Sequence, residues 1–221
     1  MYEHEFTDVK KTPLPRPAWL PKINHKLWTQ MEFYLTHREL SYPTAKFNGW
    51  YPSSEAGDNY ARVVMPATNS KGWSYWQARL IEKAEPVVKR YQSPAVSRDD
   101  SIIIVWPEKS DHMPVLILTE GPMDALAAAT CGIPGIAFMG LHPSDEAIQL
   151  IRTTMAVYVQ HVTFFADRDA LPEAIKLSNR MAQRGLAITV SHTTPYKDLA
   201  AMPLQKRTLA LNKYLSLTVN L

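Results

Sequence analysis

Three acidic residues follow two short apolar runs in this 221-residue chain. Glu120 comes directly after Val115–Thr119. Asp167 and Asp169 come directly after the run at residues 162–166. If both runs are strands of one parallel sheet, the acids lie at its carboxyl edge, where ligands gather in such sheets. Asp167 and Asp169 would then point to the same side, because side chains along a strand repeat with period two.

Carboxylates that converge in this way repel one another unless a cation neutralises them. Hard oxygen ligands suit Mg²⁺ or Mn²⁺. A pair of such ions can clamp the attacking and leaving oxygens of a displacement at phosphorus. Taken singly, each acid could be only a helix N-cap or a solvent-facing residue. Taken together, Glu120, Asp167 and Asp169 predict a two-metal site that processes nucleic acid.

The C-terminal half alternates short apolar runs with helical segments. Val115–Thr119 leads into a predicted helix at Pro122–Thr130, with proline at its first position and Gly132 just past its end. Further strands are predicted at residues 135–139, 162–166 and 186–191, and further helices at 144–157, at 172–184 and from about Pro203. This alternation predicts an α/β fold with a doubly wound parallel sheet and helices on both faces.

The N-terminal half has a different character. Residues 1–22 are predicted to be a Pro-rich arm or linker, because four prolines at positions 13–21 exclude a helix or a central strand. Residues 23–40 carry apolar side chains at helical spacing. Turns are predicted at Pro43, Asn48-Gly49 and Pro52.

A β-hairpin is predicted next, because residues 62–66 and 73–80 flank a turn at residues 69–72. Another strand is predicted at residues 101–106. Residues 23–111 therefore form a small basic α+β subdomain in this interpretation, and residues 112–221 form the α/β domain.

Composition narrows the possible functions. A net charge of +3 permits a polyanionic partner without requiring one. A single cysteine cannot build a Cys-rich zinc module. No run approaches the roughly 20 apolar residues that span a bilayer, and the acidic N-terminus is not a signal peptide. The sequence thus predicts a soluble, cytoplasmic protein with no membrane partner. A fused ATP-driven helicase is excluded on this chain, because it contains no Gly-x-x-x-x-Gly-Lys-Ser/Thr loop.

Four segments then occur in a specific order. They are LTEGPMDA at residues 118–125, GIPGIAFMG at 132–140, FFADRD at 164–169 and YKD at 196–198. An isolated Asp-x-Asp means little, but together these segments resemble the Toprim domain shared by DnaG-type primases, topoisomerases and some nucleases. The Lys-Asp pair is typical of primases. The resemblance covers about residues 115–204.

This resemblance implies roles by position. Glu120 would bind metal or act as general acid and base. Asp167 and Asp169 would be metal ligands. Asp198 would approach the metal cluster, and Lys197 would meet phosphate.

The chain also departs from the family pattern. The usual Ala-Gly after Asp169 is replaced by Ala-Leu-Pro, and Ala200 stands where a second acid follows the Lys-Asp pair. Asp124 matches the first motif, but it also lies in the first turn of a predicted helix, where a carboxylate is favourable anyway. We interpret Asp124 as structural.

The N-terminal half indicates which Toprim family is involved. RVVMP at residues 62–66, Lys71-Gly72, QAR at 77–79 and VKRYQSP at 88–94 resemble the segment that precedes Toprim in primases. Its basic residues guide template DNA and nucleotides. The resemblance implies phosphate contacts for five residues, whose alternative is plain surface charge: Arg62, Lys71, Arg79, Lys89 and Arg90.

The resemblance as a whole implies a primase catalytic core, which joins ribonucleotides on single-stranded DNA with Mg²⁺ or Mn²⁺. The expected partners are single-stranded DNA, ribonucleoside triphosphates, and a replicative helicase or a separate zinc-binding subunit. So compact a core would fit a phage or mobile-element protein. The alternatives are a Toprim nuclease that uses water as nucleophile, and a catalytically degenerate Toprim subunit that binds DNA in a replisome. A topoisomerase is disfavoured by the chain length.

Overall fold

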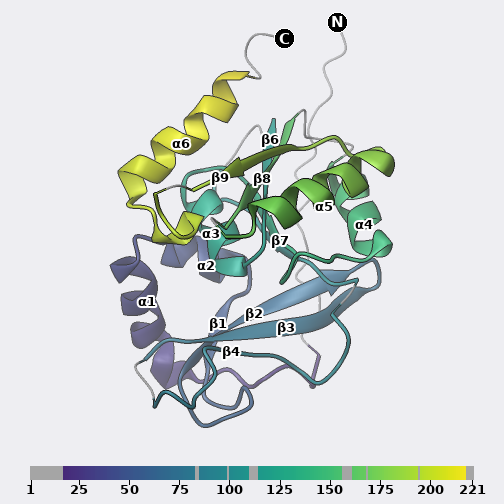
Figure 1. Ribbon diagram of the computed structural model, residues 1–221. Coiled ribbons are helices and arrows are strands. Elements are labelled where there is room, and N and C mark those ends of the chain that lie inside the picture. The colour runs from purple at the N-terminus through teal and green to yellow at the C-terminus, as the bar shows by residue number, and fades with distance from the viewer. Residues whose placement is uncertain are drawn as a thin grey trace, which may run out of the picture.

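The computed structural model describes residues 17–82, 85–98, 100–109, 114–155, 161–167, 169–193 and 195–217. It contains two sheets, and in Figure 1 the antiparallel sheet A lies below the mostly parallel sheet B. This confirms the predicted fold class, in which an α+β region precedes a parallel α/β sheet flanked by helices. The Pro-rich arm predicted at residues 1–22 falls mostly outside the described residues.

Sheet A follows chain order. Its strands are β1 (Tyr51–Ser53), β2 (Arg62–Asn69), β3 (Gly72–Leu80) and β4 (Tyr91–Gln92). The predicted hairpin is confirmed by the antiparallel pairing of β2 with β3. The turn predicted at Pro52 is wrong, because Pro52 lies within the edge strand β1, where a missing N–H is tolerated.

Helices cover one face of sheet A. They are the short η1 (His25–Leu27), α1 (Trp28–His37) and α2 (Tyr42–Phe47). The helix predicted at residues 23–40 is therefore present but shorter. The turn predicted at Pro43 is wrong, because Pro43 lies in the first turn of α2, a position that suits proline. The Ser41 side chain caps this helix by accepting a hydrogen bond of 3.1 Å from the Thr44 N–H.

Sheet B has the strand order β5-β7-β6-β8-β9. The strands are β5 (Ile103–Val105), β6 (Val115–Thr119), β7 (Gly135–Ala137), β8 (His161–Ala166) and β9 (Thr189–His192). All neighbouring pairs are parallel except β5 with β7. Ile102, just before β5, also pairs with Thr68 of sheet A through two backbone hydrogen bonds of 2.9 Å. The β5 segment thus connects the two sheets, and the domain boundary at residue 111 stays a prediction.

The helices of the C-terminal half lie on both faces of sheet B, as predicted. They are α3 (Pro122–Thr130), α4 (Asp145–Met155), α5 (Leu171–Gln183), the short η2 (Leu199–Ala201) and α6 (Leu204–Leu217). Val115 and Ile117 pack in the core that contains α3 and α6. Leu116 and Leu118, which point the other way, pack in the core that contains α4 and α5.

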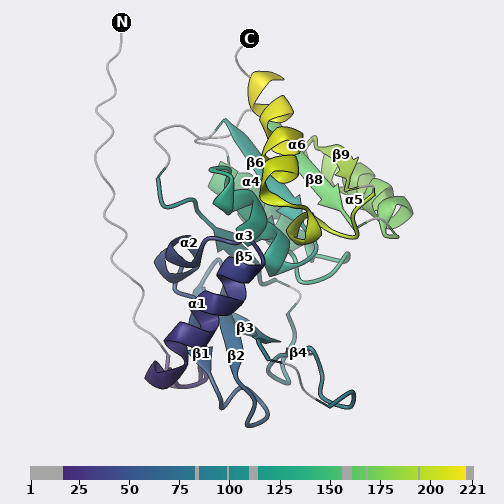
Figure 2. The same cartoon turned by 90° about the vertical axis from the view of Figure 1, so that its left-hand side faces the viewer.

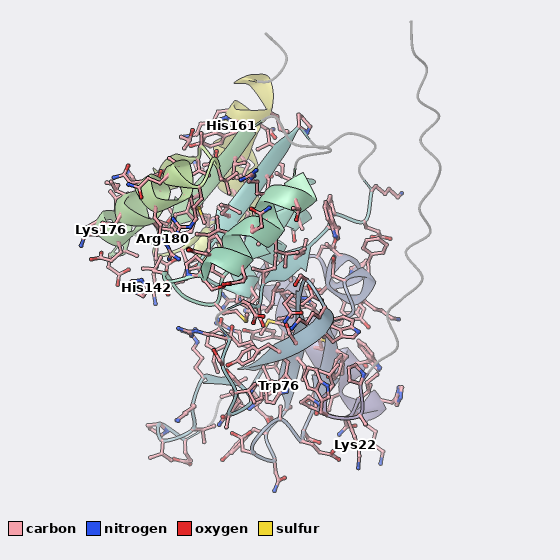
Figure 3. The ribbon with its side chains drawn as sticks, turned by 90° about the vertical axis from the view of Figure 1, so that its right-hand side faces the viewer. Lys22, Trp76, His142, His161, Lys176 and Arg180 are labelled. Atoms are coloured by element: carbon pink, nitrogen blue, oxygen red, sulfur yellow. The ribbon has the colours of Figure 1, made fainter. Side chains whose placement is uncertain are left out.

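The opposite face of sheet A carries a smaller third core. Trp76, which Figure 3 labels, packs there with Leu20 and Tyr51. Ala78, two residues further along β3, and its register partner Val64 belong to the same cluster. Tyr51 and Trp76 of this sheet are therefore used for packing. Within the described residues, none of the helices combines the length and apolar character needed to cross a membrane.

β7 approaches α3 very closely at Gly135. A methyl group on Gly135 would lie 2.4 Å from the carbonyl oxygen of Ala125. The facing part of α3 carries small side chains, and Ala125 and Ala128 are fully buried. Because helix and strand backbones touch here, the glycine fixes how α3 lies on the sheet, and so where the start of α3 meets the ends of the strands.

Candidate active site

A cleft of about 220 Å³ lies between the two sheets. The side of sheet A contributes residues of β3 and β4 and the residue that follows α1. The side of sheet B contributes residues after β6, β7 and β8, the start of α3 and the segment around η2. The cleft is lined by Arg38, Gln77, Arg79, Arg90, Tyr91, Glu120, Gly121, Pro122, Met123, Asp124, Met139, Asp167, Lys197, Asp198 and Ala200.

Carboxylates form the sheet B side of this cleft. Glu120 and Asp167 directly follow β6 and β8, whose parallel register brings the two strand ends to the same edge. Asp198 joins them from the N-cap of η2, where its side chain accepts a hydrogen bond of 2.7 Å from the Ala201 N–H. Three of the acids singled out in the sequence thus line one cleft.

Asp169 is placed differently. The strand β8 ends at Ala166, and a turn follows in which the Ala170 N–H donates to the Asp167 carbonyl at 3.0 Å. The prediction that Asp167 and Asp169 point to the same side of a strand is therefore wrong, because β8 ends at Ala166, before either residue. Asp169 is exposed and stands outside the cleft lining, although its charge acts on both Glu120 and Asp167.

The acids are electrostatically crowded. Burial, then the charges of Glu120, Asp198 and Asp169, raise the pKa of Asp167 to about 6. Burial and then Asp169 raise the pKa of Glu120, against the opposing effect of Arg98 and Lys197. A negative charge on these groups is therefore unfavourable until a cation approaches them.

Asp124 is the most buried acid of the cleft. Its Oδ1 accepts a hydrogen bond of 2.8 Å from the Ala200 N–H, which ties α3 to η2. Burial, then the charge of Asp198, raise its pKa to about 7. The structural interpretation of Asp124 is consistent with this bond.

The Asp124→Asn variant is expected to be more stable than the wild type at pH 8, by on the order of 1–3 kcal/mol. The native carboxyl holds its proton up to about pH 7, whereas its ordinary pKa is 3.8, so the wild type loses stability as the pH rises between these values. Asparagine removes the charge and keeps an acceptor for the Ala200 N–H. Urea unfolding across pH 4–8 checks this, and an unchanged pH profile would contradict it.

Basic residues form the facing side of the cleft. The guanidinium of Arg79 is nearly buried and donates to the hydroxyl oxygens of Tyr34 and Tyr91. Arg38 lies over the Tyr34 ring, 5.7 Å from its centroid. Arg90 is exposed at the rim. This side carries fixed positive charge opposite the carboxylates.

The other predicted phosphate contacts lie elsewhere. The Arg62 side chain has no exposed surface, pairs with Asp58 at 2.6 Å and donates to the Lys89 and Arg90 carbonyls. No phosphate can reach it there, so the prediction for Arg62 is corrected to a structural role. Lys71 lies in the turn between β2 and β3, outside the cleft lining, and Lys89 is exposed beside the cleft residue Arg90.

Two basic residues of the site were missed in the sequence. Arg38 reaches the cleft only because α1 packs on sheet A, and no local pattern marks it. Arg98 lies against Gly140, where an added methyl group would be 2.9 Å from its Nη2. In the sequence, only Gly140 could have indicated this contact. The glycine has a φ of 149° and no side chain, which leaves room for the Arg98 guanidinium.

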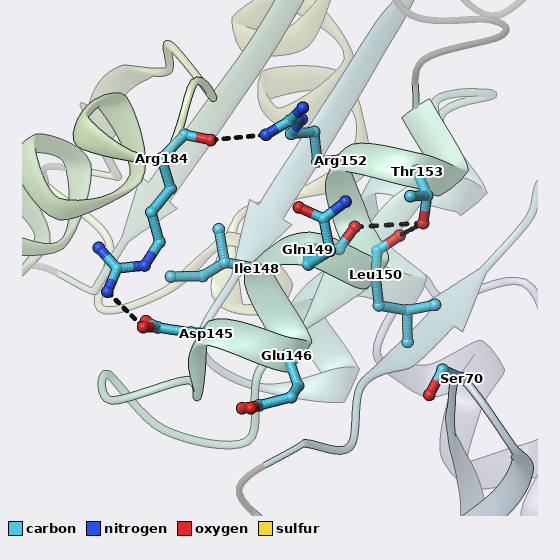
Figure 4. Close-up of a pocket in the computed structure, with 9 residues that line it drawn as sticks. All are labelled: Ser70, Asp145, Glu146, Ile148, Gln149, Leu150, Arg152, Thr153 and Arg184. Carbon is cyan, nitrogen blue, oxygen red and sulfur yellow. Dashed lines mark hydrogen bonds and ion pairs between the residues drawn. The ribbon is translucent and has the colours of Figure 1, made fainter.

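A larger hollow of about 610 Å³ lies along α4, away from these residues (Figure 4). There Asp145 pairs with Arg184, and the Arg152 guanidinium donates to the Arg184 carbonyl at 3.1 Å. None of the predicted site residues lines this hollow. We therefore place the candidate chemistry in the smaller cleft.

The cleft acids fit a hard divalent cation by their chemistry. Among the described residues, no three His, Cys, Asp or Glu side chains stand close enough to hold one ion jointly. Mg²⁺ needs only one or two carboxylates, since water and substrate phosphate complete its shell. Glu120 and Asp167, with Asp198 beside them, are the residues that would hold it.

Comparison with known proteins supports the assignment of the domain. Residues 117–202 match a family model described as Toprim-like. The match includes Glu120, Asp124, Asp167, Asp169 and Asp198, and it ends just before α6. A comparison with curated proteins finds no match.

Solved structures are similar to this chain over most of its length, and two of them are described here. The RNA polymerase domain of Mycobacterium tuberculosis primase DnaG matches with a TM-score of 0.60 at 15% identity, over 84% of this chain and 74% of that one. The second match is a chain from the structure of bacteriophage T7 lagging-strand DNA polymerase interacting with primase domains of two gp4 subunits bound to an RNA/DNA hybrid and dTTP. It has a TM-score of 0.52 at 16% identity, over 81% of this chain and 88% of that one. Residues 117–202 therefore match a Toprim-like domain, and most of the chain shares the fold of the RNA polymerase domain of a DnaG-type primase.

Proposed function

We propose that this chain is the catalytic core of a DNA primase, which synthesises short RNA primers on single-stranded DNA by metal-dependent nucleotidyl transfer. One observation carries the proposal. The cleft between the sheets sets Glu120, Asp167 and Asp198 opposite Arg79 and Arg90. The acids suit a cation and the arginines suit phosphate, and nucleotidyl transfer needs both.

The reaction joins the 3′-hydroxyl of one nucleotide to the α-phosphate of the next and releases pyrophosphate. Mg²⁺ or Mn²⁺, when bound, supplies positive charge that favours the 3′-alkoxide and neutralises the triphosphate. Glu120 and Asp167 would hold the ion, and Asp198 would assist. Asp169 adds negative charge from just outside the cleft.

The basic residues that line the cleft, including Lys197 on the sheet B side, would orient the phosphates. Arg90 and Lys197 are exposed, so they can reach a phosphate without reading sequence. Arg79 is already fixed by two tyrosine hydroxyls and therefore presents a pre-oriented charge at the cleft wall. Such pre-orientation lowers the entropic cost of binding.

The Arg90→Gln variant is expected to bind single-stranded DNA more weakly and with a shallower salt dependence. Each lost phosphate contact reduces the slope of log K against log salt by about 0.7 for single strands. Lys71→Gln is the matched control, since it removes the same charge from the hairpin turn outside the cleft. Fluorescence anisotropy with a labelled oligonucleotide at several salt concentrations checks this. Equal losses in both variants would contradict it.

The proposed function is tested by primer synthesis. The assay contains the protein, single-stranded DNA of mixed sequence, labelled ribonucleotides, and Mg²⁺ or Mn²⁺. Short RNA products that require both template and metal would support a primase core. Metal-dependent shortening of the DNA without RNA products would indicate a Toprim nuclease instead.

A second candidate is a DNA-binding Toprim subunit without catalysis. It is favoured by the absence, among the described residues, of three metal-ligating side chains at joint binding distance. Buried Ala200, where primases carry a further acid, points the same way. Under either candidate, we propose a replicative helicase or a zinc-binding subunit as a partner, and a phage-like origin.

A further inference from the structure

Arg207 lies in the first half of α6 and is fully buried, yet its guanidinium contacts backbone from two distant parts of the chain. Its Nε donates to the Leu199 carbonyl at 3.2 Å and its Nη2 to the Met202 carbonyl at 2.8 Å. Its Nη1 donates to the Glu39 carbonyl at 3.1 Å. One side chain thus binds three carbonyls.

These carbonyls belong to segments that carry opposite walls of the cleft. Leu199 directly follows Asp198 of the acidic side, and Glu39 directly follows Arg38 of the basic side. Figure 2 shows the end of α1 beneath the start of α6, where the two segments meet. Arg207 therefore connects the two walls through their backbones.

The surrounding bonds strengthen this connection. The Glu39 side chain accepts a hydrogen bond of 2.6 Å from the Leu204 N–H, so α6 and the end of α1 are joined twice. Glu39 itself has a φ of 54°, a left-handed conformation that only a strongly determined site maintains in a non-glycine residue. On the other side of η2, Asp124 holds the Ala200 N–H.

An arginine suits this position physically. The Glu39 carbonyl lies just past the end of α1, where a positive charge is favourable. The planar guanidinium spreads its donors widely enough to reach three acceptors at once. The single ammonium of a lysine does not offer that geometry.

We propose that Arg207 is a positioning residue that sets the acidic and basic walls of the cleft relative to each other. The kinetic consequence rests on the proposed function, whereas the mechanical connection does not. α6 lies beyond the Toprim-like match at residues 117–202, so the proposal makes this helix part of the site's framework.

Hydrogen–deuterium exchange on the full chain tests the connection without any activity. In Arg207→Met, exchange is expected to rise about 10- to 100-fold both at residues 197–202 and at residues 38–40, because bonds from a charged donor are lost on both sides. Arg207→Lys keeps the charge but loses the planar guanidinium that reaches three acceptors. Exchange should therefore also rise at both segments, but less than in Arg207→Met. Arg207→Lys also provides the exchange test if Arg207→Met does not fold.

Tyr214→Leu is the matched control on the same helix. Its ring packs on His161 and Phe165, 6.1 and 5.6 Å between centroids, so its loss loosens α6 without touching the three carbonyls. The proposal predicts little change at the two segments in this variant. A rise at only one segment, no rise, or the same rise in Tyr214→Leu would overturn it.

Kinetics add a second readout if the wild type makes primers. Arg207→Lys should raise the KM for ribonucleotides more than it lowers kcat, because misplaced walls weaken substrate binding first, whereas Tyr214→Leu should leave both unchanged below its melting temperature. A wild type that makes no primers would count against the proposed function alone, since exchange still decides the role of Arg207.

Discussion

Asp167→Asn is expected to reduce primer synthesis about a thousandfold or more while making the metal-free protein more resistant to heat. The loss follows because the cation's stabilisation of the transition state is worth several kcal/mol, and each 1.36 kcal/mol is tenfold in rate. The gain in stability follows because burial, and then repulsion by the neighbouring acids, raise the pKa of Asp167 to about 6. A neutral asparagine removes that repulsion.

The stability gain has a defined pH window. A raised native pKa means that the wild type loses stability as the pH rises from the ordinary value of 3.8 through about 6. The advantage of Asp167→Asn should therefore be complete above that range and absent at pH 3. Thermal melts in a metal chelator at several pH values measure it. Primer synthesis by the same preparations gives the rate.

Asp145→Asn is the matched control for this variant. Asp145 is an aspartate on α4 that pairs with Arg180 and Arg184 away from the cleft. Its neutralisation should leave primer synthesis unchanged and should not raise thermal stability. Retained activity in Asp167→Asn would remove Asp167 from the proposed metal site. A lower stability of Asp167→Asn than of the wild type at pH 8 would show that the charge of Asp167 does not destabilise the protein.

Gly135→Ala is expected to lower the free energy of unfolding by about 2–4 kcal/mol, the range of severe overpacking. The added methyl group would lie 2.4 Å from the Ala125 carbonyl oxygen, so α3 must move off the sheet. Because α3 begins beside Glu120, the same movement should reduce activity in the fraction that folds. Urea unfolding followed by tryptophan fluorescence measures the stability.

Gly132→Ala separates this steric effect from backbone strain. Gly132 has a φ of 84°, and a methyl group there meets nothing within 4 Å. Alanine at Gly132 should therefore cost only about 1 kcal/mol, from its left-handed conformation. If Gly135→Ala costs no more than Gly132→Ala, the close contact of β7 with α3 does not control the fold.

Local signals account for the parts of the fold that were predicted well. The helix predicted at Pro122–Thr130 matches α3 at both ends, because proline marks its start and glycine follows its end. β8 is found within one residue of its prediction, since its apolar run is continuous. β9 begins three residues later than predicted, at Thr189, because the preceding residues connect α5 to the sheet without pairing.

Contacts between distant segments account for what the sequence could not provide. The carboxylates were found because each follows a strand in the sequence. Arg38 could not be found, since only the packing of α1 on sheet A brings it to the cleft. Arg62 looked like a surface cation, but its burial depends on Asp58 and on the Lys89 and Arg90 carbonyls, which meet it only in the folded chain.

The acidic cluster is a cation site only if it binds a divalent ion directly, and a Mn²⁺ titration followed by electron paramagnetic resonance measures this. Saturable binding at micromolar to low-millimolar Mn²⁺ is expected for the wild type and for Asp145→Asn. Affinity is expected to fall about tenfold or more in Asp167→Asn. Absent binding in the wild type, or equal binding in Asp167→Asn, would contradict a metal-dependent active site in this cleft.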